Sequence, residues 1–384
     1  MDKIVSLAKR RGFIYPGSEI YGGLTGTWDY GPLGVELKNN IKREFWKSMV
    51  YGRDDVVGID AAILMNPKTW EASGHVQAFT DPLIECKICH ERLRADQKEE
   101  IKGHEASHKS QNPPAGGAWT QPKKFNLLVE AKLGVVEGAK QKVYLRGEIT
   151  QGVHVNFKNV IDSTRMQIPF GIAQVGKAFR NEITPGNFTF RSREFEQMEL
   201  QYYVKPEKAE AQKWYEFWKK QRMDWYLSLG MTKSKLRFRQ HEEGERAHYA
   251  KEAWDIEYDS PSGWKEFEGI HNRADWDLLQ HQKHSGVDMT YFDQKSSKRF
   301  LPYIIETSGG VDRTALFFLT DAYSQDGDRI VLKLHPKLAP FKVAVFPLLA
   351  NKPDLVKKAN DVYRLLSTDY RLQPVAWDDR GNIG

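Results

Sequence analysis

The sequence predicts an α+β fold built on an antiparallel sheet, and three observations support this prediction. Apolar and polar side chains alternate in Val153–Phe157 and in Gln197–Val204, as they do in strands that bury one face. One long helical segment follows at Pro206–Leu229. Strand patterns then return at Trp254–Tyr258 and Tyr303–Glu306. Strands that are grouped together, with helices lying outside them, are typical of the α+β class.

Composition indicates a globular protein of a reducing compartment. The 384 residues are 40% apolar and 28% charged, and the two cysteines are too few for a disulfide scaffold. The N-terminal segment lacks the apolar core of a secretion signal. The most apolar run, Val343–Ala350, is far shorter than the ~20 residues that cross a bilayer. We therefore expect a cytoplasmic protein without membrane contact; its net charge of +6 permits a nucleotide or tRNA partner but does not require one.

The N-terminal region is expected to be rich in turns and to lead into a helix. Glycines cluster within residues 22–34, and a helical pattern follows over Val35–Met49. The apolar residues of that helix recur at every fourth position: Leu37, Ile41 and Phe45. Further along, Lys98–Lys124 changes from charged residues to the run Ser-Gln-Asn-Pro-Pro-Ala-Gly-Gly. We expect this segment to be an insertion outside the main core.

The character of the chain changes again after Pro336. Lys342–Phe346 reads as a buried strand, Pro353–Leu366 as a helix and Leu372–Trp377 as another strand. This order begins a βαβ unit and hence a second, α/β domain. Because the chain reaches Gly384 only about 45 residues into that domain, we expect it to be incomplete at its C-terminal end.

Three arginines are expected near the open end of a polar hairpin. Phe179–Glu182 and Phe190–Phe195 read as strands joined by a short loop, and they carry Arg180, Arg191 and Arg193. Guanidinium is planar, permanently charged and bidentate, so it suits a phosphate that gains charge in a transition state. The alternative is a surface hairpin with ordinary ion pairs.

A second segment strengthens the phosphate interpretation. Glu306–Arg313 contains paired glycines, which allow a close backbone approach, and it leads into an apolar helix at Thr314–Tyr323. Arg313 therefore lies at or near the start of a helix. Two arginine-bearing segments more than 100 residues apart, each next to a strand, indicate one shared nucleotide site.

The insertion carries a possible zinc site. Cys86-x2-Cys89 and His104-x3-His108 are separated by fourteen residues, a spacing close to that of Cys₂His₂ sites. Bound metal would order a polar segment that buries little by itself. His90 is a possible substitute ligand. The alternative is a free dithiol beside two solvated histidines.

These motifs, taken in order, resemble a known family. The segments that resemble its entry region and dimer-forming motif 1 are Gly12–Tyr15, Ser18–Gly23 and Tyr30–Gly34; motif 2 is matched by Ala178–Pro185 and Phe190–Glu199, and motif 3 by Gly309–Arg313. On these residues the chain resembles the class II aminoacyl-tRNA synthetases over essentially its whole length, and within them the homodimeric glycyl-tRNA synthetases.

The resemblance implies a role for each matching position. Arg180 and Arg313 would be the catalytic arginines, at the α-phosphate and γ-phosphate of ATP, with Phe195 stacked on adenine. The implied ATP-binding residues are Arg180, Asn181, Glu182, Phe190, Arg191, Ser192, Arg193, Glu194, Phe195, Glu266, Phe267, Gly310, Val311, Asp312 and Arg313. The implied glycine-binding residues are Arg94, Glu148, Phe195, Glu196, Gln197, Met198, Glu199, Arg273, Glu306, Thr307, Ser308, Gly309 and Gly310.

The resemblance also implies an activity and an organisation. Glycine and ATP, with Mg²⁺, would form glycyl-adenylate and pyrophosphate, and the glycyl group would pass to the 3′ end of tRNA(Gly). Residues 1–335 would form the class II catalytic domain of a homodimer, with the insertion at about 83–124 and zinc as a possible structural ion. Residues 340–384 would begin an anticodon-binding domain.

Two loops depart from the family pattern. In the loop Arg146–Gly152, Gly147 and Ile149 replace residues that shape the loop in the family. In the loop Glu306–Gly310, Thr307 and Gly309 replace the usual family residues. Both loops gain flexibility where preorganisation matters, so the departures concern catalytic efficiency more than reaction type.

Two alternatives remain at the level of sequence: a synthetase-like protein that only binds nucleic acid, and a synthetase for a different amino acid. Histidines outside the possible zinc site, such as His154, His241 and His281, are expected to be structural. His271 is the exception, because it lies beside Arg273 where the family has a small residue.

Overall fold

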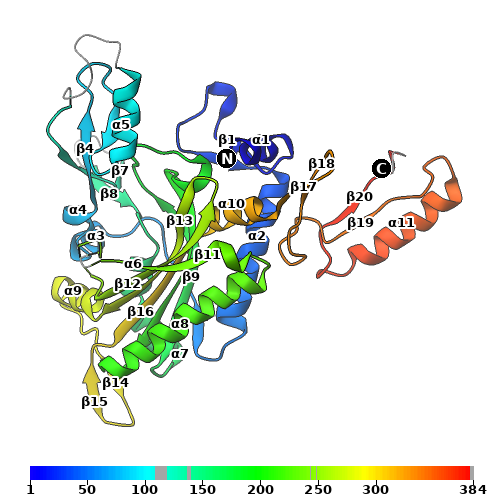
Figure 1. Ribbon diagram of the computed structural model, residues 1–384. Helices are drawn as coiled ribbons and strands as arrows, with labels where there is room; N and C mark the ends of the chain where they lie inside the picture. The colour runs from blue at the N-terminus through cyan, green and yellow to red at the C-terminus, as the bar shows by residue number, and fades with distance from the viewer. Residues whose placement is uncertain (109–118, 136–139, 243, 248, 381–384) are drawn as a thin grey trace.

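A computed structural model describes residues 1–108, 119–135, 140–242, 244–247 and 249–380 (Figure 1). Its centre is a seven-stranded sheet in the order β11-β12-β13-β16-β10-β9-β3. The strands are β3 (Val56–Gly58), β9 (Phe170–Phe179), β10 (Glu194–Val204), β11 (Leu236–Gln240), β12 (Glu252–Ser260), β13 (Gly263–Ala274) and β16 (Tyr303–Gly310). Every neighbouring pair is antiparallel except β3 with β9. The α+β prediction is confirmed.

Each face of this sheet has its own core, since neighbouring residues of a strand point to opposite faces. Tyr202 packs with the long helix α8 (Lys208–Ser228), together with α2 (Pro32–Trp46) and α10 (Val311–Ala322). Tyr203 packs on the other face with α6 (Thr150–Val155), α7 (Phe157–Thr164) and α9 (Trp276–Ser285). The helix predicted over Pro206–Leu229 is confirmed as α8.

The strand predicted at Val153–Phe157 is wrong, because these residues lie in α6 and at the start of α7. Val153 and Phe157 are fully buried four positions apart, a spacing that places both on one face of a helix, whereas Val155 is 37% exposed. Over five residues, alternation at every second position is compatible with either period, and the tertiary core selected the helix.

The insertion forms a small layer of its own. It has a three-stranded sheet, β5 (Arg92–Arg94), β4 (Thr80–Glu85) and β6 (Lys123–Asn126), together with α5 (Lys98–Ser107). Figure 1 shows this layer at the opposite end of the view from β14 (Tyr291–Asp293) and β15 (Lys298–Phe300). The Ser-Gln-Asn-Pro-Pro-Ala-Gly-Gly run lies outside the described residues.

The C-terminal elements fall where the sequence places them. β19 (Val343–Val345) pairs in parallel with β20 (Val375–Trp377), and α11 (Pro353–Ser367) connects them. This βαβ unit lies beyond β17 (Tyr323–Asp326) and β18 (Arg329–Leu332), to the side of the main sheet (Figure 1). The elements are confirmed, whereas their assignment to an anticodon-binding domain stays a prediction.

The other elements are short. They are α1 (Asp2–Arg10), β1 (Ile14–Pro16), β2 (Trp28–Tyr30), α3 (Pro67–Ala72), α4 (His75–Ala78), β7 (Val129–Leu133), β8 (Gln141–Leu145), β14 (Tyr291–Asp293) and β15 (Lys298–Phe300), with single turns at Glu19–Tyr21, Lys47–Tyr51, Phe188–Phe190 and Lys233–Lys235. Among the helices of the described residues, none has the length and apolarity that crossing a membrane would need.

Candidate active site

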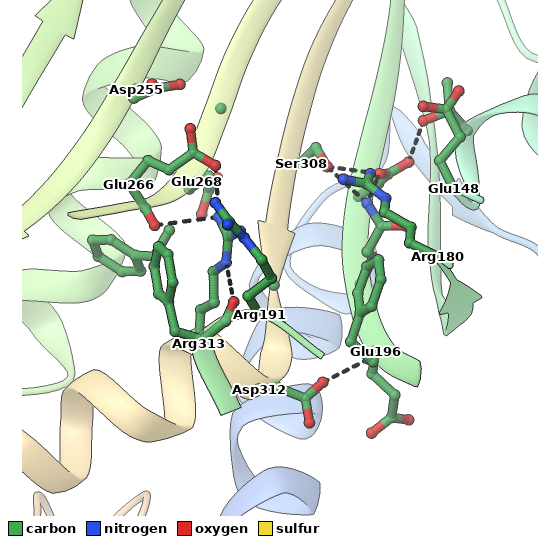
Figure 2. A pocket seen from close by; sticks show the side chains of 18 of the residues that line it. Glu148, Arg180, Arg191, Glu196, Asp255, Glu266, Glu268, Ser308, Asp312 and Arg313 are labelled. Carbon is green, nitrogen blue, oxygen red and sulfur yellow. Dashed lines mark hydrogen bonds and ion pairs between the residues drawn. The ribbon is translucent and has the colours of Figure 1, made fainter. Parts of the chain in front are cut away.

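A cavity of about 280 Å³ opens over β10, β13 and β16 at the start of α10 (Figure 2). Seventeen of the residues implied by the resemblance line it: Glu148, Arg180, Glu182, Phe190, Arg191, Ser192, Phe195, Glu196, Gln197, Glu199, Glu266, Phe267, Glu306, Ser308, Gly310, Asp312 and Arg313. These residues come from segments up to 165 positions apart, and the antiparallel pairing of β10 with β9 and β16 brings them together.

The arginine end of the cavity is built from motif residues on two elements. Arg313, in the first turn of α10, donates to the carboxylate of Glu266 (2.6 Å) and to the carbonyl oxygen of Phe190 (3.0 Å). Its guanidinium also lies over the Phe190 ring. Figure 2 shows Arg191 beside Arg313 and Glu266, so two guanidinium groups lie at this end of the cavity.

Arg180 lies on the opposite side of the cavity, beside Ser308 and Glu148 in Figure 2. It follows β9 directly, and its Nε donates to the Gly147 carbonyl oxygen at 3.1 Å. The guanidinium lies between the rings of Phe79 and Phe195, about 5 Å from each centroid. These contacts hold a permanent positive charge between the two ends of the cavity.

The other end of the cavity is acidic and almost fully buried. Glu199 lies within hydrogen-bond distance of Thr150 Oγ1 (2.6 Å), Ser308 Oγ (2.6 Å) and Gln197 Nε2 (2.9 Å), and its neutral form donates its own O–H to one of the two hydroxyl oxygens. Thr150 also donates to Glu306 at 3.1 Å, which places the two carboxylates on one hydroxyl group. Burial, followed by the charges of Glu306 and Glu148, raises the pKa of Glu199 to about 8. Glu199 is therefore largely neutral at pH 7.

The two neighbouring carboxylates stay ionised. Burial opposes the charge of Glu148, but His75 and Arg273 overcome it and lower the pKa of Glu148 to about 2. The pKa of Glu306 is likewise held well below its ordinary value, because Arg273 and His271 outweigh the cost of burial. Arg273 donates to Glu306 at 3.0 Å, and His271 Nδ1 lies 2.6 Å from its carboxylate. The pocket therefore carries two negative charges and one proton.

Several of the implied residues do not line the cavity: Arg94, Asn181, Arg193, Glu194, Met198, Arg273, Thr307, Gly309 and Val311. Arg273 is fully buried beneath the pocket and holds Glu306 from behind, with its other side on Asp277 (2.7 Å). Arg94 lies in the insertion, where it pairs with Asp81 (2.6 Å) and Asp96 (2.7 Å).

Eight residues line the cavity without having been singled out as site residues: Thr150, Thr189, His241, Tyr249, Asp255, Glu268, Gly269 and His271. His241 Nε2 lies 2.6 Å from Asp255, and this hydrogen bond raises the pKa of His241. His241, which the sequence led us to expect as structural, lines the cavity. Alternation along Glu266–Glu268 gives no signal for Glu268, because the register of β12 with β13 shifts within this stretch.

A buried ion-pair cluster attaches the cavity floor to α2. Lys38 lies 2.8 Å from both Asp312 and Glu196, and Asp312 also accepts from the Glu196 backbone N–H at 2.6 Å. These contacts join α2, β10 and the first turn of α10. They fix the position of Arg313, which is the next residue after Asp312.

The insertion brings the four possible zinc ligands together. One ligand atom from each of Cys86, Cys89, His104 and His108 lies within 4.8 Å of the others. Cys89 Sγ and His104 Nε2 are 3.5 Å apart, which is the edge length of a tetrahedron with metal bonds of about 2.0–2.3 Å. His104 Nδ1 lies 2.9 Å from Glu91, a carboxylate contact that leaves Nε2 free to ligate.

His90 is not part of this cluster, since it pairs with Glu85 at 3.1 Å. Burial opposes ionisation of Cys86, but hydrogen bonds from the Cys89 backbone and from His104 lower its pKa to about 6. The donor set of two thiols and two imidazoles, with a carboxylate behind one imidazole, fits Zn²⁺.

Comparisons with known proteins agree with this geometry. Residues 135–322 match the family model of the tRNA synthetase class II core domain (G, H, P, S and T). The glycine–tRNA ligase of Treponema denticola is 50% identical over 394 residues, covering all of this chain and 85% of that protein. The glycine–tRNA ligase of Thermobifida fusca is 49% identical over 409 residues, covering all of this chain and 86% of that protein.

A solved structure shows the same fold. Prolyl-tRNA synthetase of Giardia lamblia, in complex with prolyl-adenylate, superposes with a TM-score of 0.69 at 16% sequence identity. The match covers 99% of this chain, which spans 63% of the length of that protein. At this identity the likeness concerns the fold alone.

Proposed function

The chain belongs to the glycine–tRNA ligase family of class II aminoacyl-tRNA synthetases, and from this membership we propose how its own residues activate glycine. It is a glycine–tRNA ligase, and ATP is its substrate. The observation that supports the assignment of residues is the cavity itself, with permanent positive charge at one end and a buried acidic pocket at the other.

The acidic pocket would bind the α-ammonium of glycine. Glu148 and Glu306 supply two negative charges, and Glu199 with Ser308 and Thr150 completes a ring of oxygen atoms around a small volume. Larger amino acids would have to place a side chain against these buried groups. Steric exclusion of a larger ligand is the direction in which a pocket discriminates well.

The arginine end would bind ATP. Arg180 would meet the α-phosphate, with Arg313 and Arg191 on the remaining phosphates and Phe195 against adenine. A glycine carboxylate oxygen then attacks the α-phosphorus, the bond to the bridging oxygen breaks, and pyrophosphate leaves. No protein nucleophile is needed, because positioning and charge stabilisation lower the barrier. In the second step a terminal tRNA hydroxyl attacks the adenylate carbonyl carbon and AMP leaves.

Mg²⁺ would neutralise phosphate charge at the arginine end. Glu266 is the candidate acidic ligand there, because its side chain is half-exposed at the cavity and lies on the same side as Arg313. The ion would spread the charge that develops on pyrophosphate as it leaves.

The finer assembly is also part of the proposal. We assign tRNA(Gly) as the nucleic-acid partner, the cytoplasm as the location and a homodimer as the assembly. Exposed apolar side chains near motif 1 support a dimer: Ile20 is 88% exposed and Tyr21 is 87% exposed. Residues 340–384 would contact the anticodon arm, with residues 1–335 forming the catalytic domain.

We assign Zn²⁺ to Cys86, Cys89, His104 and His108 as a structural ion. Thiolate and imidazole are its preferred ligands, and the insertion has only a small three-stranded sheet to hold it together. Metal analysis of the purified protein tests this directly, with one zinc per chain expected and loss of the ion expected in Cys89→Ser.

Pyrophosphate exchange on the purified enzyme tests the proposed active site. With Mg²⁺ and ATP, exchange should depend on glycine and should not occur with alanine or serine. Exchange with alanine at a comparable rate would show that the acidic pocket does not select for size. Absence of exchange with every amino acid would favour the alternative in which the protein only binds nucleic acid.

A further inference from the structure

Among the described residues of the insertion, Gln97 makes a side-chain hydrogen-bond contact with the arginine end of the cavity. In the orientation that satisfies its neighbours, the amide oxygen of Gln97 accepts from Arg191 Nη1 (2.7 Å) and Nη2 (2.9 Å), and its nitrogen donates to Glu100. Arg191 lines the cavity. Both terminal nitrogens of the guanidinium donate to this one amide oxygen, which restrains the Arg191 side chain. An element outside the catalytic sheet therefore orients an arginine of the active site.

Gln97 and the possible metal ligands lie at opposite ends of one helix. Gln97 is the residue that precedes α5, whereas His104 lies in its last turn and His108 directly follows it. Figure 1 shows α5 in the insertion, in the same region of the view as β4. The metal site would tie the C-terminal end of α5 to the turn that carries Cys86 and Cys89, just after β4. A bound metal would thereby restrain the end of α5 that lies away from Gln97.

Helix α5 has little else to hold it. It is ten residues long and, throughout its described length, no apolar side chain of α5 is buried. Isolated helices shorter than about 12–15 residues are marginal in water, so α5 needs a tertiary anchor. The main side-chain contacts at its C-terminal half run through His104 and through Glu105, which accepts from Trp119 at 2.9 Å.

The opposite end of the insertion is braced by Arg94. Its Nη1 donates to Asp81 at 2.6 Å, which joins β5 to β4, and its Nη2 donates to Asp96 at 2.7 Å. Asp96 is the residue before Gln97. Arg94 therefore fixes the approach to α5, and a bound metal would fix the far end of the same helix.

We propose that a metal ion bound by Cys86, Cys89, His104 and His108 positions Arg191 through α5 and Gln97, and so sets the affinity of the enzyme for ATP. Zn²⁺ is the ion that the donor set favours. The inference rests on the proposed role of Arg191 in ATP binding. Gln97 is a positioning residue, because it acts on ATP through Arg191.

The test compares two variants that break the path at different points. Cys89→Ser removes an exposed ligand and is expected to lose the metal, whereas Gln97→Ala is expected to keep it. Both should weaken ATP binding by about tenfold, the effect of one hydrogen bond to a charged group. The double variant should be no weaker than Cys89→Ser alone, because both changes interrupt one path. Lys102→Ala, an exposed change within α5, is the matched control and should alter neither property.

The readouts separate this inference from the proposed function. Metal content is measured by mass spectrometry, and the Kd for ATP by calorimetry, which requires no amino acid. Where exchange is active, KM for ATP should rise while KM for glycine stays constant. A Cys89→Ser protein that loses the metal yet binds ATP normally would overturn the inference, as would additive losses in the double variant. Loss of glycine-dependent exchange in the unmodified enzyme, with the ATP effects intact, would instead refute the proposed function.

Discussion

At the scale of single residues, the acidic pocket divides its carboxylates by charge. Glu148 and Glu306 are held ionised by His75, Arg273 and His271, and burial beside those two charges keeps Glu199 protonated. The difference in charge between Glu306 and Glu199 follows from their distances to the buried Arg273, which donates to Glu306 but does not contact Glu199. A pocket that already holds two charges accepts a cation more readily than a third negative charge.

Glycine binding should therefore release a proton from Glu199. The bound ammonium group favours the ionised carboxylate, so the pKa of Glu199 is expected to fall below its value of about 8 when glycine binds. Affinity for glycine is then expected to rise with pH up to about 8, since below that value the proton must be displaced. Calorimetry in buffers with different ionisation enthalpies at pH 7 measures the number of protons released. Glu199→Gln, which mimics the neutral carboxyl group, should show none, and equal release from both proteins would contradict this assignment.

Arg180 is expected to act on the transition state more than on stability. Arg180→Ala removes a cavity-lining charge whose Nε, within the described part of the chain, donates to a carbonyl oxygen and not to a carboxylate. Loss of a group that stabilises developing charge costs about 10²–10³ in kcat. Exchange kinetics with glycine provide the measurement. Arg299→Ala, at an exposed ion pair far from the cavity, is the control that should retain full activity, and a similar kcat in the two variants would exclude the proposed role.

At the scale of elements, the site depends on the attachment of α10 to the sheet and to α2. Lys38 from α2 lies between Asp312 and Glu196, and the side chains of all three are at most 15% exposed. Burial opposes the charge of Glu196, but Lys38 and then Lys42 outweigh it, so the pKa of Glu196 is lowered. Because Arg313 follows Asp312, this cluster sets the direction of an active-site arginine from outside the cavity.

Removing the cation of this cluster should lower the free energy of unfolding of the protein. Lys38→Met leaves two buried carboxylates without their shared partner, and breaking a buried pair in this way costs about 3–5 kcal/mol. Urea unfolding near pH 7 measures the loss. The additional change Asp312→Asn should recover part of it by removing one uncompensated charge. A single variant as stable as the unmodified protein would contradict this prediction, and would mean that Lys42, which already lies 3.0 Å from Glu196, is a sufficient partner for that carboxylate.

At the scale of the whole molecule, the catalytic sheet and the C-terminal βαβ unit are held together differently. Leu338 is fully buried in the main core, and Asn40 donates to the carbonyl oxygens of Leu338 and Ala339. Beyond this anchor, α11 has no buried side chain among its residues, all of which the structure describes. The unit therefore lies outside the core that builds the active site.

A chain ended after Phe341 should activate glycine but charge tRNA poorly. The shortened chain keeps Leu338 and every residue that lines the cavity, so glycine-dependent exchange is expected within about twofold of the full chain. Aminoacylation of tRNA(Gly) should weaken through a higher KM for tRNA, because residues 340–384 are assigned to the anticodon arm. Equal aminoacylation by both chains would refute that assignment.

The sequence by itself determined the fold class, the family and most of the cavity lining. Motifs such as Phe190–Glu199 and Gly309–Arg313 are contiguous in sequence, so they can be recognised without the tertiary structure. The long helix Pro206–Leu229 could also be predicted from sequence, because no glycine or proline interrupts residues 207–229. The segment Val153–Phe157 was too short for its period to be decisive, and burial against Phe170 and Tyr203 made it helical.

Only the tertiary structure decided which residues face the cavity and which carboxylate keeps its proton. His241 and His271 reach the site from the β12–β13 side of the sheet; His271 was marked by its place beside Arg273, whereas no local pattern marks His241. Arg94 was expected at the glycine site but forms ion pairs within the insertion. Gln97 contacts Arg191, which lies 94 positions further along the sequence. Burial and the distance between charges arise where distant strands meet, and the pKa of Glu199 depends on both.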